Sequence, residues 1–195
     1  MKVAVADYGA GNLRSVCSAF ERAGAEPVVT GDVANAPLAV IAGVGNAASA
    51  AVELERRGLA DQLRERVAAG RPVFGICLGM QLFFGESEEG GSGLGLLEGE
   101  VVRLRAREVP HMGWNTLELA APSDVLSGLD GADLYFAHSY AARTEDAVVA
   151  VAQHDGRVVA AVERGALAGV QFHPERSGGA GARILQNVLR WSSAA

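Results

Sequence analysis

A cysteine between two glycines is the residue best placed by its neighbours for nucleophilic chemistry. Cys77 ends the apolar run Val-Phe-Gly-Ile, typical of a buried strand, and precedes a stretch that can begin a helix. Gly75 and Gly79 allow close backbone packing around a residue in a strained, exposed turn. Peptide N–H groups at a helix N-terminus favour thiolate over thiol. We therefore predict a nucleophile at Cys77; the alternative is a small core residue, the usual fate of a free cysteine.

A histidine and a carboxylate near the end of the chain can complete a catalytic set. Residues 166–172 predict a strand that delivers His173-Pro174-Glu175, and Pro174 stops that strand. Acyl transfer by a thiol needs a group that takes its proton and a carboxylate that orients this group. A lone strand-end histidine more often makes a local hydrogen bond. Together with Cys77, however, His173 and Glu175 favour a Cys-His-Glu triad.

The Gly-Val-Gly stretch at residues 43–45 follows another predicted strand. Attack on an amide carbonyl places negative charge on oxygen, and each backbone N–H aimed at that oxygen contributes about 3–4 kcal/mol in hydrolases. We expect the N–H groups of Val44 and Leu78 to form this oxyanion hole. The alternative, a phosphate-binding turn, lacks the spacing of a dinucleotide fingerprint and a Walker A lysine.

The elements that must position these residues alternate between strand and helix in the first half of the chain. Strands are predicted over residues 2–7, 26–30, 38–42 and 72–76, and helices over residues 12–23 and 52–69. This pattern is typical of a parallel sheet with helices on both faces.

From residue 100 onward the pattern changes to short strands followed by one helix. The strands are predicted over residues 100–104, 114–119, 133–139, 148–153, 158–163 and 167–172, and the helix over residues 181–191. We expect an α/β three-layer sandwich with a flavodoxin-like, mostly parallel central sheet and added antiparallel strands. Residues 1–195 should form one domain, because no linker divides them. Residues 85–95, rich in Glu and Gly, are either a lid or a solvated loop.

Composition and charge exclude several classes of protein. The chain has 195 residues, 49% of them hydrophobic, which fits a compact domain with a sizeable core. A net charge of −6 without a basic cluster argues against nucleic acid as a partner. No apolar run is long enough to span a bilayer. No group of Cys, His and carboxylates has metal-ligand spacing, so we expect no metal or other cofactor.

The cellular compartment follows from the cysteines and the first residues. Cys17 and Cys77 do not make a disulfide framework. The chain opens directly with a predicted strand rather than with a signal peptide. We therefore expect a cytoplasmic protein.

Several motifs, in their order along the chain, resemble a known family. Those at residues 43–45 (Gly-Val-Gly), 75–81 (Gly-Ile-Cys-Leu-Gly-Met-Gln) and 171–175 (Gln-Phe-His-Pro-Glu) resemble class I, triad-type glutamine amidotransferases. Three stretches narrow this resemblance: Asp-Tyr-Gly-Ala-Gly-Asn-Leu-Arg-Ser at residues 7–15, Pro-His-Met-Gly-Trp-Asn at residues 110–115, and Phe-Ala-His-Ser-Tyr at residues 136–140. Together they resemble the glutaminase subunits of imidazole glycerol phosphate synthases, over nearly the whole chain.

The resemblance implies an activity, a partner and roles for further residues. Glutamine would be hydrolysed through a thioester on Cys77. The ammonia would pass to a (β/α)8-barrel cyclase in a heterodimer, which makes imidazole glycerol phosphate and aminoimidazole carboxamide ribotide in histidine biosynthesis. By the same analogy, glutamine would be held by Gly45, Gln81, Glu89 and the backbone of Ser139 and Tyr140. The partner would be faced by Asn12, Met112, Trp114, Tyr135 and Arg176.

The chain departs from the family pattern at three places. Ala42 stands where the family usually carries proline, which frees the backbone before the oxyanion loop. The stretch Asn-Ala-Ala-Ser at residues 46–49 replaces the usual Phe-Gly. Arg176 replaces a lysine, and the two differ as ion-pair partners.

Other readings of these residues remain open from the sequence. Trp114 and Tyr135 can be core aromatics, and His111 and His138 can be local hydrogen-bond donors. His154 is most simply part of a hairpin turn. A different glutaminase of the same class, a cysteine hydrolase or peptidase on the same scaffold, and a non-catalytic binding module are the alternative functions.

Overall fold

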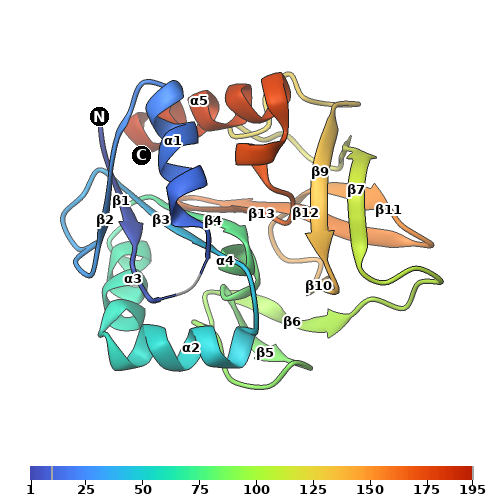
Figure 1. The fold of residues 1–195 in the computed structure, drawn as a ribbon, viewed down its shortest axis with the longest axis horizontal. Coiled ribbons are helices and arrows are strands. Elements are labelled where there is room, and N and C mark those ends of the chain that lie inside the picture. The colour runs from blue at the N-terminus through green and yellow to red at the C-terminus, as the bar shows by residue number, and fades with distance from the viewer. Residues whose placement is uncertain (10, 195) are drawn as a thin grey trace.

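A mixed eight-stranded sheet runs through the middle of the computed structural model, which describes residues 1–9 and 11–194 (Figure 1). Its strand order is β2-β1-β3-β4-β13-β12-β11-β8. The first five strands are parallel, in the order of flavodoxin-like sheets, and β12, β11 and β8 add antiparallel pairs at one edge. The expected fold class is confirmed. Ala10 of the 7–15 motif and Ala195 lie outside the described residues.

The parallel strands place their carboxyl ends along one edge of the sheet, where ligands bind in such folds. They are β1 (Lys2–Ala6), β2 (Glu26–Thr30), β3 (Leu38–Gly43), β4 (Val73–Cys77) and β13 (Leu167–Val170). Strands β3, β4 and β13 are buried along their whole length, as continuous apolar runs predict for strands covered on both faces.

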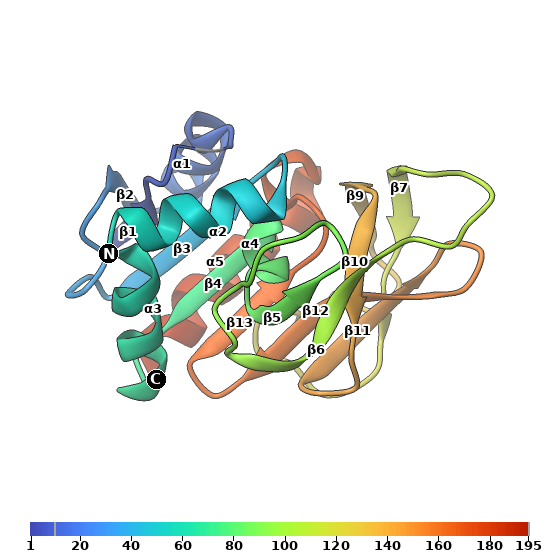
Figure 2. The same cartoon turned by 90° about the horizontal axis from the view of Figure 1, so that it is seen from below.

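Helices cover both faces of this sheet, with α1 and α5 on one side and α2 and α3 on the other (Figures 1 and 2). Their bounds are α1 (Leu13–Arg22), α2 (Ala47–Arg56), α3 (Leu59–Ala68), the short α4 (Leu78–Gln81) and α5 (Gly178–Ala194). Each face has its own hydrophobic core. One contains Phe20 of α1 and Ile184 of α5, and the other contains Leu54 of α2 and Leu63 of α3.

The second half of the chain supplies the antiparallel strands and two small sheets. Strands β8 (Glu118–Leu119), β11 (Val148–Gln153) and β12 (Arg157–Arg164) complete the central sheet. Strands β5 (Phe84–Ser87), β6 (Leu97–Arg103) and β10 (Tyr140–Arg143) form one small sheet, and β7 (His111–Thr116) pairs with β9 (Asp133–His138) in another. The 3-10 turn η1 (Pro174–Arg176) precedes α5.

The helix predicted over residues 52–69 was wrong in detail. It is two helices, because Gly58 adopts a left-handed conformation with φ 67° between them. The first of these helices begins earlier, where the Asn46 side chain accepts a hydrogen bond from the Ser49 N–H. The stretch after Cys77 begins a helix, as expected, and this helix has one turn. Residues 85–87 belong to strand β5, and the segment that follows them contains turns and bends.

The hairpin predicted at His154 is confirmed. Strands β11 and β12 are antiparallel neighbours, and the His154 N–H donates to the Gly156 carbonyl at 2.8 Å. Within the described residues, 1–9 and 11–194, no helix has both the length and the apolar character needed to cross a membrane.

A buried arginine ties helix α3 to the loops beneath it. Arg66 is fully buried, and its guanidinium donates to the carbonyl oxygens of Val33, Ala34, Ala36 and Pro72 at 2.8–3.1 Å. Burial, together with the nearby charge of Arg71, lowers the pKa of Arg66 to about 10. The side chain therefore replaces water as the partner of four backbone acceptors.

We predict that Arg66→Met will destabilise the fold, because the Val33 and Ala36 carbonyl groups lose their donor, while the Ala34 and Pro72 carbonyl groups keep only Arg71 and the Ala39 N–H. A loss of at least about 3 kcal/mol is expected, which for a chain of this size lowers Tm by about 6–12 °C in thermal unfolding. Arg56→Met is the matched control, since Arg56 pairs only with Glu53 at the surface. Equal Tm values for the two variants would contradict the role of Arg66.

Candidate active site

Cys77 occupies a strained turn between strand β4 and helix α4. Its backbone has φ 53° and ψ −108°, one of the few positive φ angles at a non-glycine residue of the described chain. A Cβ at Gly79 would collide with the Ile41 carbonyl oxygen, and a Cβ at Gly75 would lie 2.7 Å from the Met80 nitrogen. The two glycines therefore permit the close packing that the sequence predicted around this cysteine.

The sheet register brings distant segments level with Cys77. In the parallel pairs, Gly43 of β3 lies opposite Cys77, and Val170 of β13 lies opposite Ile76. Residues 43–45 and residues 171–173 therefore leave the sheet on either side of the cysteine. This is the carboxyl edge of the parallel strands, where loops can project side chains into one cavity.

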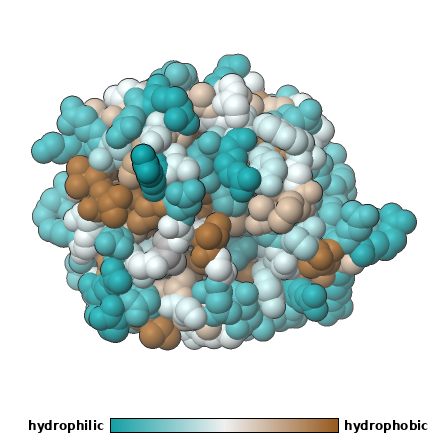
Figure 3. Space-filling view, in the orientation of Figure 1, coloured by the Kyte–Doolittle hydropathy of each residue, from teal (hydrophilic) through white to brown (hydrophobic). Residues whose placement is uncertain are grey.

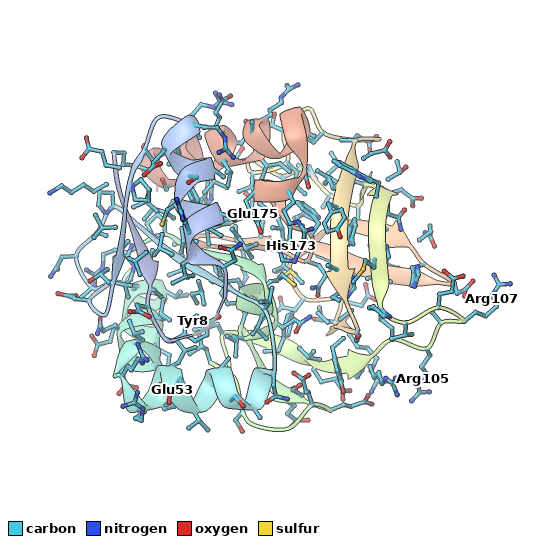
Figure 4. The ribbon with its side chains drawn as sticks, in the orientation of Figure 1. Tyr8, Glu53, Arg105, Arg107, His173 and Glu175 are labelled. Atoms are coloured by element: carbon cyan, nitrogen blue, oxygen red, sulfur yellow. The ribbon has the colours of Figure 1, made fainter. Side chains whose placement is uncertain are left out.

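His173 and Glu175 form a buried pair next to this edge (Figure 4). The His173 Nδ1 lies 2.8 Å from the Glu175 Oε1, and their side chains are only 5% and 8% exposed. The His173 N–H donates to the Tyr135 carbonyl at 2.8 Å, and the Ser177 hydroxyl donates to the His173 carbonyl at 2.7 Å. The backbone of His173 is therefore held on both sides.

The environment of the His173 ring favours its charged form. Burial lowers the pKa of His173, but the nearby Cys77 and the hydrogen-bonded Glu175 outweigh burial and raise it to about 10. The Nε2 atom is buried and has no hydrogen-bond partner among the described residues. The ring thus offers one nitrogen to Glu175 and leaves the other available beside the cysteine.

A cavity of about 220 Å³ opens directly over Cys77. It collects all seven residues that the sequence assigned to the oxyanion hole and to glutamine. Its lining consists of Val44, Gly45, Cys77, Leu78, Gln81, Glu89, Pro110, Met112, Ala137, His138, Ser139 and Tyr140.

The two segments expected to form the oxyanion hole border this cavity together. Leu78 is the first residue of α4, directly after Cys77. Val44 is 52% exposed at the cavity rim, and Gly45 beside it has φ 110°. The Tyr8 hydroxyl donates to the Ala42 carbonyl at 3.1 Å, just ahead of this loop. Burial and the nearby Cys77 raise the pKa of Tyr8, so its hydroxyl stays protonated and can donate.

The residues assigned to glutamine binding make hydrogen bonds that connect neighbouring segments of the cavity wall. The Gln81 Nε2 donates to the Tyr140 carbonyl at 2.7 Å. The Glu89 carboxylate accepts from the Ala47 N–H at the start of helix α2, a favourable place for a negative charge. The Ser139 carbonyl accepts from the Leu104 N–H at 2.9 Å. These contacts leave other polar atoms of the same residues to face a ligand.

The residues assigned to the partner interface are mostly exposed, and Met112 among them also lines the cavity. Met112 and Trp114 of β7 are 65% and 60% exposed. The Trp114 and Tyr135 rings meet edge to face at 6.1 Å, and the Arg176 guanidinium lies 4.2 Å above the Tyr135 ring. Asn12 is apart from them and caps helix α1 through the Ser15 N–H. Figure 3, in the orientation of Figure 1, shows separate brown groups of apolar side chains among teal ones.

One residue of the site was missed by the sequence reasoning. Gln171 is fully buried, and its Nε2 lies 3.6 Å from the Cys77 Sγ. Its signal was a polar residue near the end of an otherwise apolar predicted strand, two residues before His173. His138, expected to be either a local donor or a site residue, is both: it lines the cavity and its Nδ1 bonds the Tyr140 carbonyl at 2.8 Å.

Cys17, the other cysteine, lies in a different environment. It is half-buried in helix α1, and both burial and the Glu21 carboxylate raise its pKa. A raised pKa disfavours the thiolate, so Cys17 is poorly suited to attack. Across residues 1–9 and 11–194, no cluster of three His, Cys, Asp or Glu side chains could hold a metal ion.

Comparison with known proteins gives a consistent set of similarities. Residues 4–191 match the family model for class I glutamine amidotransferases. The chain is 47% identical to the imidazole glycerol phosphate synthase subunit HisH of Mycobacterium bovis, over 95% of each chain. It is 45% identical to HisH of Geobacillus kaustophilus, over 96% of this chain and 95% of that one.

Solved structures show the same fold at lower identity. A crystal structure of a glutamine amidotransferase superimposes with a TM-score of 0.78 at 22% identity, over 98% of both chains. A chain of PurLQS from Thermotoga maritima gives a TM-score of 0.77 at 21% identity, over 97% of this chain and 98% of that one.

We predict that Glu175→Gln will lower the pKa of His173 below about 10, because it removes one of the two groups that raise it. The ring nitrogen shifts of labelled histidine, followed by NMR against pH, measure this value. Glu145→Gln is the control, since Glu145 pairs with Arg157 at the surface. An unchanged His173 titration in Glu175→Gln would contradict the assignment.

The same pair makes a prediction for stability. The folded pKa of His173 lies above its ordinary value of 6.5, so the stabilisation is complete below about pH 6.5 and is lost as pH rises through about 10. Glu175→Gln should therefore destabilise the protein more at pH 6 than at pH 10. Denaturant unfolding at the two pH values measures the difference.

Proposed function

The chain belongs to the class I glutamine amidotransferase family, and we propose that it is the glutaminase subunit of imidazole glycerol phosphate synthase. It would hydrolyse glutamine to glutamate and ammonia in the cytoplasm, for histidine biosynthesis, with residues 1–195 acting as one amidotransferase domain. The observation that carries the proposal is the buried His173–Glu175 hydrogen bond beside a cysteine in a strained turn. The names of relatives at 45–47% identity support the specific pathway.

The reaction begins when the Cys77 thiol gives its proton to His173, and the resulting thiolate attacks the side-chain amide carbon of glutamine. The charge that develops on the amide oxygen is stabilised by the N–H groups of Val44 and Leu78, which border the same cavity. Because the pKa of His173 is raised, the ring is protonated and can give its proton to the leaving ammonia. The carbon–nitrogen bond breaks, and a γ-glutamyl thioester remains on Cys77.

Water then completes the cycle. The His173 ring, now neutral, takes a proton from a water molecule, which attacks the thioester carbon and releases glutamate. Glu175 orients the ring and stabilises its charged form through the Nδ1 contact. Glutamine is held in the cavity by Gly45, Gln81, Glu89 and the backbone of Ser139 and Tyr140.

Ammonia formed in this cavity needs an acceptor. We propose a (β/α)8-barrel cyclase as the partner of a heterodimer, docked over Asn12, Met112, Trp114, Tyr135 and Arg176. Met112 belongs both to this surface and to the cavity wall, so the partner would sit directly above the site of ammonia release. The cyclase would use the ammonia to make imidazole glycerol phosphate and aminoimidazole carboxamide ribotide.

The direct test of the nucleophile is covalent labelling. A diazoketone analogue of glutamine, added to the chain in complex with the cyclase, should form one adduct, on Cys77. Peptide mapping by mass spectrometry locates it, and the Cys17→Ser variant should be labelled as fully as the wild type. An adduct on Cys17 with Cys77 unmodified would refute the proposal.

We also predict that the isolated chain is a poor glutaminase. The loop at residues 43–45 can switch by rotating the peptide that carries the Val44 N–H, which glycine neighbours make sterically easy. Loss of this donor slows turnover about 10²–10³-fold. Partner binding would then favour the competent loop through contacts made only in that state. Tyr8, bonded to the Ala42 carbonyl, anchors the strand from which the loop springs.

Glutamate release by the lone chain, by the complex and by an Ala42→Pro variant measures this switch. Proline restricts the backbone before the loop, so Ala42→Pro should lower the basal rate of the lone chain further while the complex stays active. A lone chain as fast as the complex saturated with the cyclase's ligand would rule out the switch.

A further inference from the structure

A fully buried glutamine side chain contacts the reactive sulfur directly. Gln171 follows strand β13, and the register that pairs Val170 with Ile76 places it level with Cys77. Its backbone N–H donates to the Ala160 carbonyl at 2.8 Å, which holds the residue in line with the strand. Its side-chain nitrogen lies 3.6 Å from the Cys77 Sγ, within hydrogen-bond distance for sulfur.

The orientation of this amide follows from a backbone carbonyl on its far side. The Tyr140 carbonyl can only accept, so the Gln81 group at 2.7 Å from it must be the NH₂ group. That same NH₂ group lies 3.1 Å from the Gln171 side chain, which must therefore present its oxygen. The remaining end of Gln171, the NH₂ group, is the end that faces Cys77.

The second partner of the Tyr140 carbonyl reinforces this orientation. The His138 Nδ1 lies 2.8 Å from the carbonyl oxygen and must donate to it. The two donors, from His138 and Gln81, occupy both acceptor sites of the oxygen. Burial lowers the pKa of His138 to about 3, so this ring stays neutral and its hydrogen bond persists across the working pH range.

A neutral Cys77 thiol would be a poor acceptor for the buried NH₂ group of Gln171. Sulfur in a thiol is a weak acceptor, and a buried N–H that lacks a good acceptor is costly. A thiolate is a charged acceptor, and hydrogen bonds to charged groups are roughly twice as strong. The donor is therefore well matched only to the ionised form of Cys77.

We infer that Gln171 is a further catalytic residue, whose NH₂ group stabilises the Cys77 thiolate in an orientation set by Gln81 and the Tyr140 carbonyl. The inference rests on the proposed function, because it concerns the same cysteine. His173 approaches the thiolate as its proton partner, whereas Gln171 contacts it as a neutral donor. Gln171 therefore stabilises the negative sulfur without taking part in proton transfer.

The test measures thiolate reactivity without glutamine. The whole chain, in a Cys17→Ser background, is treated with iodoacetamide, and alkylation of Cys77 is followed by mass spectrometry from pH 5 to pH 9. Gln171→Leu should slow alkylation at pH 7 about tenfold and move the profile to higher pH, because the donor is lost. Gln171→Glu keeps the shape of the side chain and should slow alkylation of Cys77 further, since a carboxylate repels the thiolate.

Controls separate this inference from folding and from the proposed function. Gln153→Leu removes an exposed glutamine on β11 and should leave the alkylation profile unchanged. Thermal unfolding of each variant shows whether it is folded. If Gln171→Leu does not fold, the alkylation profile of Gln171→Glu tests the role of Gln171 instead. Wild-type alkylation rates in a folded Gln171 variant overturn the role of Gln171 alone. If wild-type Cys77 reacts no faster than Cys17 in a Cys77→Ser chain, the nucleophile and this inference both fail.

Discussion

The unfavourable backbone conformation of Cys77 is the constraint on which the rest of the structure depends. A positive φ at a residue with a Cβ costs about 1–3 kcal/mol and persists only where the surroundings determine it. Here α4 packs so closely against β3 and β4 that Gly79 has no room for a side chain beside Ile41, and Gly75 has none beside Met80. The conformation lifts the sulfur out of the sheet towards residues that come from both halves of the chain. Packing energy from the two cores offsets this local cost.

Parallel pairing explains why so many separate segments meet at one atom. Strands β3, β4 and β13 end at the same edge, so the residues that follow them come together without any long-range loop. The antiparallel part of the chain then closes the cavity from the other side, with residues 137–140 as its wall. The arrangement of residues around Cys77 therefore follows from the pairing of the parallel strands. Substitutions deep in these strands would shift the site as a unit.

Local patterns predicted those parts of the molecule that local forces determine. The strained turn at Cys77 was predictable because glycine at residues 75 and 79 signals close backbone approach. The break at Gly58 was not, because a single glycine is compatible with a continuous helix until tertiary packing decides. Strand β10 was missed because Tyr-Ala-Ala-Arg has no alternating pattern. Gln171 was missed because its partner Cys77 is 94 residues away, and only the folded sheet reveals that contact.

The Tyr140 carbonyl also has a consequence for proton movement. Hydrogen bonds run from Asn115 through His111 and His138 to this oxygen, and from there through Gln81 and Gln171 to the sulfur. A relay must hand a proton on at every member, but a carbonyl oxygen that accepts from both sides has none to give. The series of hydrogen bonds is therefore interrupted, as a proton relay, at the Tyr140 carbonyl. A proton therefore cannot pass along this chain from His111 and His138 to Cys77.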